Sequence, residues 1–301
     1  MKEGIHRSPL FYVGDKYKLM AEIKTHFPPT IGRFIEPFVG GGSVFMNVEA
    51  KYFIANDIDT NIVNIHKMLC SYCNRPDDFF NDIFQTIAQY GLSLSYLHDS
   101  VPLQLKKGFP KLYYAKYNKS AYETLRDDYN SSDRSNFLLL YVLMIYGFNR
   151  MIRFNKSGNF NVPVGNVDFN ENVHSALVDY FEQVQQKNIQ WHSTDYSAFL
   201  NNIQFTDEDL VYLDPPYLIT FSEYNKLWDE NNEATLLGLL DRLNEQGVRF
   251  AISNVTHYKG RENAIFLEWS NRYNSHPIKS NYISFNDNSN KSFNEVLITN
   301  Y

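Results

Sequence analysis

The sequence contains little that would support a disulfide scaffold, a membrane span or a secretory signal. It has two cysteines among 301 residues, which excludes a disulfide-stapled fold and fits a reducing compartment. The longest apolar run, 137–146, has ten residues, too few to cross a bilayer, and is expected to form a buried helix. No basic stretch followed by an apolar one marks the amino end. We therefore expect a cytoplasmic protein.

The protein has an overall excess of negative charge, which argues against nucleic-acid binding. The distribution of charge along the chain, however, is uneven. The formal net charge is −6, yet residues 104–167 hold ten Lys and Arg against four Asp and Glu, a local charge of +6. A basic middle segment favours a surface that faces phosphates, while the acidic remainder repels DNA. The alternative is a solvated basic face that has no partner.

Hydrophobic runs of two periodicities predict an α/β sheet interrupted by helices. Strand-like runs occur at 34–39, 52–55, 189–192, around Val211, at 248–253 and at 295–299, and helix-like stretches at 60–71, 76–90, 120–129 and 136–146. The helices fall between halves of one sheet. We predict a Rossmann-like sheet with helices on both faces (1–62 and 187–301) and a mostly helical inserted domain (63–186). The Asn/Ser-rich stretch 285–292 predicts a mobile loop.

The most informative motif follows the buried run 210–213. Asp214, Pro215, Pro216 and Tyr217 end a strand at the sheet edge where open α/β proteins bind ligands. Methylation of an exocyclic amine on a base needs two N–H acceptors, and the Asp214 carboxylate and the Pro215 carbonyl, held in direction by the proline pair, provide them. Tyr217 offers a face for an extruded base. The alternative is a plain turn, since Pro-Pro is itself a turn signal.

A second motif combines a strand, a glycine loop and a downstream acid. The run 34–39 leads into Gly40, Gly41, Gly42 and Ser43, where backbone can approach a ligand closely, and a helical pattern follows. Asp57 ends the next strand and can accept ribose hydroxyls, although a plain βαβ turn would also fit. Phe45 stands where the third glycine of a G-x-G-x-x-G fingerprint would be, so the fingerprint is incomplete. Together Glu36 and Asp57 make the pocket acidic, which suits a cationic sulfonium better than a pyrophosphate.

Together these motifs resemble those of Dam-type adenine-N6 DNA methyltransferases of the α group, over nearly the whole chain and with the strongest likeness to the Dam enzymes of T-even bacteriophages. The segments that carry the resemblance are 12–16, 36–42, 56–58, 147–155, 159–163, 214–217 and 224–225. It implies a methyltransferase fold, S-adenosyl-L-methionine as cofactor and double-stranded DNA as substrate. It also implies base flipping followed by direct in-line transfer, in a bacterial cell or phage-infected host.

The resemblance also assigns cofactor-binding residues. They are Tyr12, Gly14, Lys16, Glu36, Pro37, Phe38, Gly40, Gly41, Gly42, Ser43, Asp57, Ile58, Asp195, Tyr196 and Asp214. The glycine loop is expected under the methionine part, Asp57 and Ile58 at the ribose and adenine. Tyr196 is expected at the far side of the adenine. Asp15 departs from the family pattern, in which a glycine or an asparagine is common at this place.

Residues 153–161 predict a β-hairpin whose turn contains Gly158. A two-stranded ribbon fits the major groove, where Arg and Asn recognise guanine and adenine, but an ordinary surface hairpin has the same pattern. The resemblance places DNA contacts on Phe148, Asn149, Met151, Arg153, Phe154, Asn155, Asn159 and Pro163. Phe154 is either a wedge for the gap left by a flipped base or a core aromatic.

These patterns predict a site-specific DNA adenine-N6 methyltransferase, of the Dam or restriction-modification kind, with GATC as the expected target. The alternatives are an RNA or protein-amide methyltransferase with the same catalytic motif, and a non-catalytic DNA-binding relative. A nicotinamide enzyme would need the missing glycine fingerprint. His66, Cys70 and Cys73 share a helix face but have no fourth ligand, and small cysteines usually belong to the core, so no metal is expected.

Overall fold

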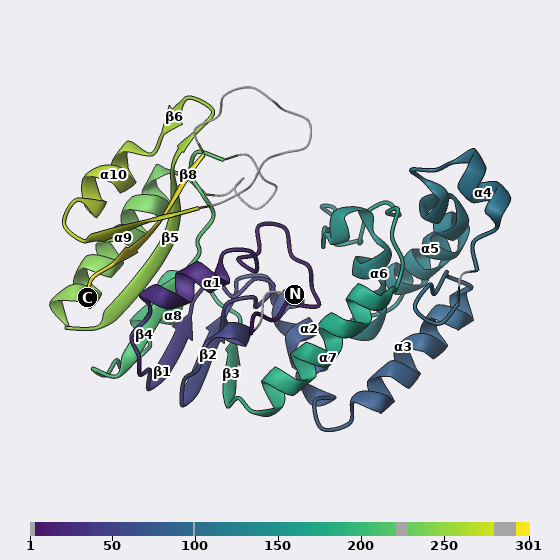
Figure 1. Cartoon of the computed structure of the whole chain (residues 1–301), viewed down its shortest axis with the longest axis horizontal. Coiled ribbons are helices and arrows are strands. Elements are labelled where there is room, and N and C mark those ends of the chain that lie inside the picture. Colours follow the sequence, from purple (N-terminus) through teal and green to yellow (C-terminus); the bar gives the residue numbers. More distant parts are fainter. Residues whose placement is uncertain (1–3, 99, 221–227, 280–292) are drawn as a thin grey trace.

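The computed structural model describes residues 4–98, 100–220, 228–279 and 293–301, and it shows one sheet beside a group of helices (Figure 1). The strand order is β3-β2-β1-β4-β5-β8-β7, and β6 pairs with β5. The strands are β1 Arg33–Glu36, β2 Tyr52–Asn56, β3 Ile189–His192, β4 Asp209–Leu213, β5 Arg249–Tyr258, β6 Arg261–Glu262, β7 Asn274–Ile278 and β8 Asn294–Thr299. Strands β1 to β5 pair in parallel, whereas β8 is antiparallel to β5 and β7. The predicted α/β class is confirmed.

Local signals set the ends of several helices. The helices are α1 Met20–Ile23, α2 Thr60–Ser71, α3 Pro76–Tyr90, α4 Leu103–Gly108, α5 Tyr113–Ser131, α6 Phe137–Tyr146, α7 Glu171–Gln185, α8 Tyr196–Asn201, α9 Glu230–Glu245 and α10 Ala264–Ser270, with 3-10 turns η1 Lys24–His26, η2 Phe45–Asn47 and η3 Phe148–Arg150. The Asp59 side chain caps α2 by accepting from Asn61 N. Helix α3 begins with a proline and ends at Gly91, whose φ is 72°. The predicted stretches 60–71 and 76–90 coincide with these two helices.

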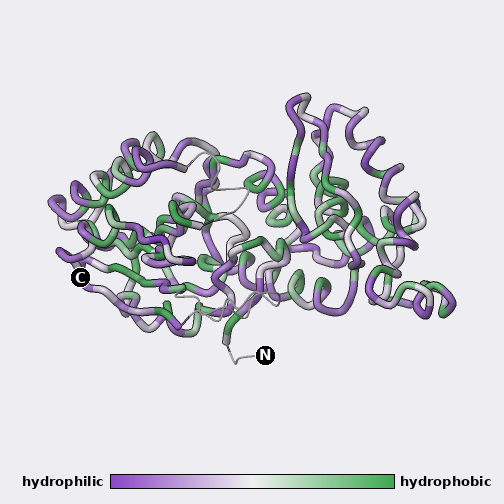
Figure 2. The backbone as a smooth tube through the Cα atoms, turned by 90° about the horizontal axis from the view of Figure 1, so that it is seen from above, coloured by the Kyte–Doolittle hydropathy of each residue, from purple (hydrophilic) through white to green (hydrophobic). Residues whose placement is uncertain are grey.

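Alternating side chains on the strands build two cores. On β1, Ile35 packs in a cluster with α8, α9 and α10, while its neighbour Phe34 belongs to the cluster that contains α1, α2, α6 and α7. In Figure 2 the hydrophobic stretches run through the interior and the hydrophilic turns lie outside. Helix α6 is the predicted buried helix, with residues 140–146 fully buried. Because one cluster continues from the sheet into α2–α7, the boundaries of the inserted domain stay a prediction.

Two features differ from the sequence expectations, the element after the glycine loop and two helices. The helical pattern after the glycine loop forms only the turn η2, because Asn47 donates to Ser43 O and exchanges hydrogen bonds with the His6 backbone. The predicted hairpin does form, with an antiparallel bridge between Phe154 and Phe160 and backbone hydrogen bonds from Asn161 N to Arg153 O and from Asn155 N to Asn159 O. Helices α7 and α9 were not predicted. The predicted loop 285–292 and the segment 224–225 lie outside the described residues. Within the described residues, no helix combines the length and apolarity needed to cross a membrane.

Candidate active site

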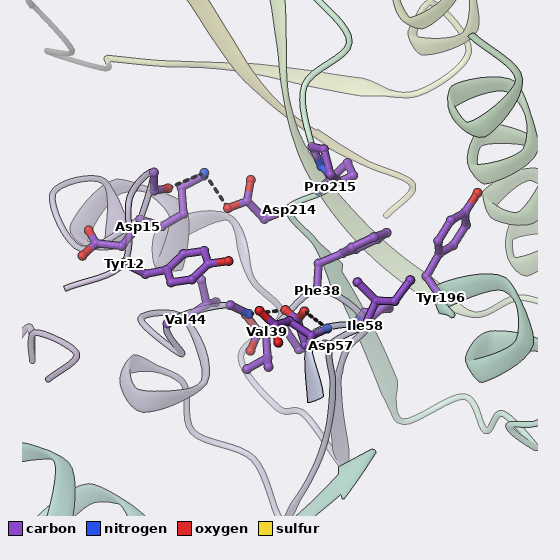
Figure 3. A pocket seen from close by; sticks show the side chains of 18 of the residues that line it. Tyr12, Asp15, Phe38, Val39, Val44, Asp57, Ile58, Tyr196, Asp214 and Pro215 are labelled. Carbon is purple, nitrogen blue, oxygen red and sulfur yellow. Dashed lines mark hydrogen bonds and ion pairs between the residues drawn. The ribbon is translucent and has the colours of Figure 1, made fainter. Parts of the chain in front are cut away.

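A cavity of about 410 Å³ opens at the carboxyl ends of β1, β2 and β4, where the order of the strands reverses around β1 (Figure 3). Such a reversal leaves a crevice between the loops that follow neighbouring strands. Every residue that the sequence analysis assigned to cofactor binding or to the catalytic motif lines this cavity. Those residues come from segments far apart in the chain, so the sheet brings the predicted site together.

The glycine loop is held in place from two sides. Asp57 Oδ2 accepts from Gly40 N at 2.8 Å, and the other carboxylate oxygen accepts from Asp59 N at 2.9 Å. The φ of Gly40 is 46°, and a Cβ on Gly41 would lie 2.6 Å from the Tyr12 Cβ, so the loop excludes side chains at its closest approach. Burial raises the pKa of Asp57 to about 6. Asp57 therefore shapes the loop as well as facing the cavity.

His66 on α2 supports the same loop, and both of its ring nitrogens have hydrogen-bond partners there. Its Nε2 lies 2.9 Å from Gly40 O, and its Nδ1 lies 2.9 Å from Tyr180 OH. Burial lowers the pKa of His66 to about 4, so the ring is neutral: Nε2–H donates to the carbonyl and Nδ1 accepts from the tyrosine. Cys70 Sγ lies 3.5 Å from Tyr180 OH. No group of three potential metal ligands occurs among the described residues.

Buried acids make the floor of the cavity receptive to a cation. Glu36 is 2% exposed, and within the described part of the chain neither its Oε2 nor Ser43 Oγ has a hydrogen-bond partner. Burial, and then the nearby Asp214 and Asp57, raise the pKa of Glu36 well above its usual range. A ligand with a positive charge and N–H donors would satisfy Glu36 and relieve the repulsion between the carboxylates.

Three aromatic rings form the opposite end of the cavity. The ring centroids of Phe38 and Tyr196 are 5.2 Å apart, and Trp228 lies 5.9 Å from Phe38 and 5.6 Å from Tyr196. Asp195 lines the cavity but also caps α8, because its Oδ1 accepts from Ser197 N at 2.9 Å. The sequence analysis missed Trp228, which belongs to no motif and reaches the cavity only through the fold. This apolar wall suits a flat ring.

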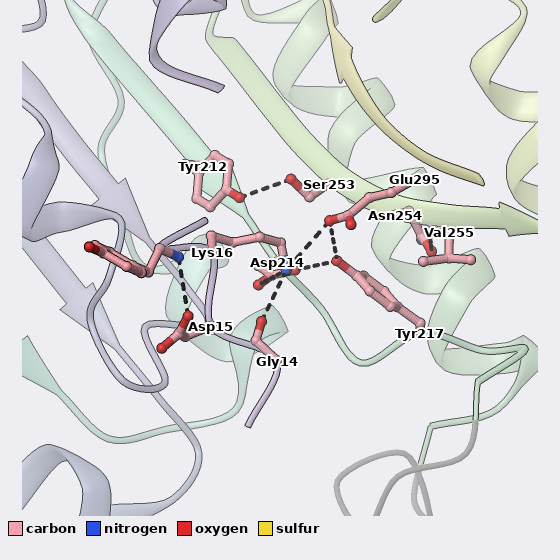
Figure 4. A network of polar contacts seen from close by, with 11 residues as sticks. Gly14, Asp15, Lys16, Tyr212, Asp214, Tyr217, Ser253, Asn254, Val255 and Glu295 are labelled. Carbon is pink, nitrogen blue, oxygen red and sulfur yellow. Dashed lines mark hydrogen bonds and ion pairs between the residues drawn. The ribbon is translucent and has the colours of Figure 1, made fainter. Parts of the chain in front are cut away.

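The catalytic motif lies in a charged network shown in Figure 4. Lys16 Nζ is 2.6 Å from Asp214 Oδ2 and 3.7 Å from Glu295 Oε1, and the lysine is only 3% exposed. Tyr217 OH lies 2.8 Å from Asp214 Oδ1 and 3.2 Å from Glu295 Oε1, with the Lys16 ammonium 5.2 Å from its ring centroid. The carboxylate of Asp214 is therefore held at both oxygens, which fixes its direction.

Glu295 is the second residue that the sequence analysis missed. It lies on β8 beside β5, is 2% exposed, and shares Lys16 and Tyr217 with the catalytic aspartate. Its position 78 residues from Tyr217 left no local signal. The predicted stacking role of Tyr217 stays a prediction, since Lys16 stands over its ring.

The predicted DNA-contacting residues lie on a turn-rich surface of the helical part, and several also hold that surface together. Arg153 Nε and Nη2 donate to Asn161 Oδ1 and O, both at 2.9 Å. Asn155 Oδ1 accepts from Ser157 N and Asn159 N in the hairpin turn. Phe154 is half-buried and packs edge-on against Phe160 at 5.7 Å, and its role as a wedge stays a prediction.

The other predicted DNA contacts are more open. Phe148 is 51% exposed, and its backbone N–H donates to Pro163 O at 2.8 Å. Asn149 and Pro163 are exposed, and Met151 is half-buried. Asn149 has a φ of 53°, a left-handed backbone conformation that few residues other than glycine adopt. These four residues are placed where a large ligand can reach them.

Comparison with known proteins places the chain in one protein family. The profile of the D12 class N6 adenine-specific DNA methyltransferases matches residues 12–283. The chain is 36% identical over 304 residues to the type II methyltransferase M.FokI of Planomicrobium okeanokoites, covering 98% of this chain and 43% of that protein. It is 35% identical over 307 residues to the modification methylase StsI of Streptococcus sanguinis, with the same two coverages.

A DNA adenine methylase is also similar over its length. The enzyme of Escherichia coli (strain K12) is 26% identical over 304 residues, which cover 97% of this chain and 94% of that enzyme. By contrast, the chain spans 43% of the length of M.FokI and of StsI. The stronger likeness to phage Dam enzymes stays a prediction.

Proposed function

The chain belongs to the D12 class of N6 adenine-specific DNA methyltransferases, and from this premise we propose that it methylates the N6 amine of adenine in a short duplex DNA site, with S-adenosylmethionine as methyl donor. The observation that carries the proposal is Asp214, which ends β4 in the same cavity as the glycine loop and is oriented by Lys16 and Tyr217. A carboxylate fixed at this edge can accept an N–H bond from a base amine.

The cavity fits the proposed cofactor. When bound, S-adenosylmethionine supplies a methyl group on a positively charged sulfur. The buried Glu36 carboxylate, with its unpartnered oxygen, would hold the cofactor's ammonium group, and Ser43 would bond to the same methionine part. Asp57 would accept from the ribose hydroxyls through lone pairs that the loop amides leave open. The rings of Phe38, Tyr196 and Trp228 would pack against the adenine.

For the substrate amine, the work of the protein is positioning and electrostatics. Asp214 accepts one N–H, and the Pro215 carbonyl accepts the other, so the nitrogen lone pair is drawn out of the ring and toward the methyl donor. Transfer is direct and in line, and the target adenine is flipped out of the duplex to reach the cavity. Lys16 and Glu295 keep the Asp214 carboxylate in place during this step.

A transfer assay tests the reaction class. The protein is incubated with methyl-labelled S-adenosylmethionine and, side by side, with duplex DNA, RNA and a mixed protein substrate. Label is expected in DNA alone, and digestion to nucleosides is expected to give N6-methyladenine. Label in RNA or protein would favour the corresponding alternative, and no label in any substrate would support a non-catalytic relative.

Asp57→Ala is expected to weaken cofactor binding by about 1–3 kcal/mol, because the ribose acceptor is lost. The structure adds a second cause, since the same side chain holds Gly40 N and hence the loop. Calorimetric titration of S-adenosylmethionine measures the change. An unchanged affinity would move the ribose role to another residue.

Asp57→Asn is the matched control, because an amide keeps the shape and one oxygen acceptor but never ionises. Since burial raises the pKa of Asp57 to about 6, the wild-type carboxylate gains a proton as the pH falls through that value. A cationic cofactor binds the ionised form better, so its affinity is expected to fall below pH 6 in the wild type. The variant should show a weaker pH dependence, limited to the contribution of Glu36.

DNA recognition is proposed for the inserted segment 63–186, and Phe148, Asn149, Met151, Arg153, Phe154, Asn155, Asn159 and Pro163 are the proposed contacts. The local charge of +6 over residues 104–167 and the exposure of Phe148, Asn149 and Pro163 support this. The Dam resemblance makes GATC the expected target, with Arg153, Asn149 and Pro163 near its bases.

Selection at the outer base pair of this target is expected to be loose. The resemblance to phage Dam enzymes implies an arginine just after the Pro-x-Gly of the hairpin, whereas this chain has Asn166 and Val167 after Gly165. Loss of one bidentate arginine contact removes about 1–3 kcal/mol of discrimination at a base pair. Single-molecule sequencing of plasmid DNA methylated by the pure enzyme measures every modified site. Methylation at GATC sites alone would contradict the predicted loose selection at the outer base pair. Methylation at an unrelated sequence would contradict the assignment of the recognition residues.

A further inference from the structure

A second groove, of about 500 Å³, lies beside the active-site cavity. Its lining includes Arg7, Phe11, Phe148, Arg150 and Asn166, and no aspartate or glutamate lines it. Phe11 is followed in the chain by Tyr12, which lines the active-site cavity, so both hollows border the same amino-terminal segment. We call this hollow the arginine groove. Arg7, Phe11 and Arg150 were not among the residues assigned from the sequence.

Two guanidinium groups in the arginine groove stack on one ring. The Cζ of Arg150 lies 3.8 Å from the Phe11 ring centroid, and that of Arg7 lies 4.6 Å from it. Stacking uses the flat face of a guanidinium and leaves its N–H edge available for an anion. Neither side chain forms an ion pair or a side-chain hydrogen bond with any described residue; the carboxylates that act on them, Asp15 on Arg7 and Asp168 on Arg150, do so without direct contact.

Burial disfavours the positive charge of Arg150. Burial is the main cause that lowers its pKa to about 10, and the charge of Arg7 acts in the same direction. Tyr141 and Asp168 act against this, but Asp168 is already committed to Ser93 and Ser95. A half-buried cation that no carboxylate contacts directly is what a site for an anionic ligand requires before the ligand binds.

Backbone strain is concentrated in the same groove. Five non-glycine residues have a positive φ in the described chain, and three of them, Phe11, Asn149 and Arg150, line this groove. A left-handed backbone conformation at a non-glycine residue persists only where the surrounding structure imposes it. Such conformations are common at ligand-binding sites. The groove is held from the other side as well, because Tyr141 of α6 donates to Pro9 O at 3.0 Å and fixes the amino-terminal segment against the helical part.

From this juxtaposition we propose that Arg7 and Arg150 form a clamp for a backbone phosphate of the DNA substrate, next to the base that enters the active-site cavity. The inference rests on the proposed function, because it takes DNA as the substrate. Phosphate is favoured over a base edge because two like charges line one groove and stack on one ring. One phosphodiester lies between them without any requirement on sequence.

The clamp has a distinct signature in salt dependence. Each phosphate neutralised by a basic side chain adds about 0.9 to the slope of log affinity against log salt concentration. Arg150→Met replaces the guanidinium that stacks on Phe11 with an apolar side chain of similar length and so removes the charge. It is expected to lower the slope by about 0.9 and the affinity by about tenfold, equally for a cognate and a scrambled duplex. Arg7→Met should act in the same direction.

The measurement uses fluorescein-labelled duplexes, one with the methylated site found by sequencing and one scrambled, titrated with the full chain over a range of salt concentrations. Arg150→Lys is expected to restore the slope, because the charge returns. Arg242→Met, an exposed arginine on α9, removes the same charge elsewhere and should leave the slope unchanged. Cofactor titration of each variant verifies that its active-site cavity is intact.

Two outcomes overturn the clamp. One is a slope in Arg150→Met and Arg7→Met equal to that of the wild type, and the other is a loss confined to the cognate duplex, which indicates base recognition. A wild-type protein that binds and methylates RNA in place of DNA overturns the proposed function first, and the clamp with it. That result is seen before any variant is compared, so the two failures are distinguishable.

Discussion

Asp214→Ala is expected to abolish methyl transfer while leaving cofactor and DNA binding largely in place. The carboxylate accepts from the amine as its lone pair moves toward the methyl donor, so its contribution is made in the transition state. Loss of one such acceptor costs on the order of 3 kcal/mol or more, which is a hundredfold or greater in rate. Single-turnover transfer to a duplex that carries the established site measures the rate without interference from product release.

Asp214→Asn separates the charge from the shape of the side chain. An amide retains one oxygen near Lys16 but loses the negative charge that the lysine and the substrate amine both face. A rate loss in both variants, with cofactor and DNA affinities close to those of the wild type, is the expected pattern. Activity within about threefold of wild type in either variant would remove Asp214 from the reaction.

Lys16→Met is expected to have the largest effect on stability. Lys16 is 3% exposed and stands between Asp214 and Glu295, at 2.6 and 3.7 Å. Removing the cation leaves two carboxylates close together with their main counter-charge gone, and breaking a buried pair in this way costs about 3–5 kcal/mol. Urea unfolding at constant slope measures the loss in the free energy of unfolding.

Two further variants test the cause of that loss. Lys51→Met removes an ion pair with Glu208 whose side chains are 68% and 62% exposed, and its expected cost is at most about 1 kcal/mol. Adding Glu295→Gln to Lys16→Met removes one of the two stranded charges and is expected to restore part of the stability. If Lys16→Met costs no more than Lys51→Met, the buried network does not hold the site together.

Much of the candidate site was predictable because its residues sit in short motifs at the ends of strands. Asp214 and Asp57 each follow an apolar run, and parallel strands bring their carboxyl ends to one edge. Glu295 and Trp228 were not predictable in this way. The contact between Lys16 and Asp214 spans 198 residues, and no local pattern records such a pairing. Glu295 and Trp228 reach the site only because of the way the strands and loops are arranged in the folded chain.

The sequence by itself determined the α/β class, the helices α2 and α3, the buried helix α6 and the composition of the pocket. Periodicity, caps and strand-end motifs depend on residues close together in the chain, so they can be recognised from the sequence without knowledge of the fold. Tertiary structure alone decided that the helix after the glycine loop shrinks to η2 and that Arg7 and Arg150 both stack on Phe11. Each of these depends on side chains that are distant in the chain and compete for the same space or hydrogen bonds, and only packing settles that competition.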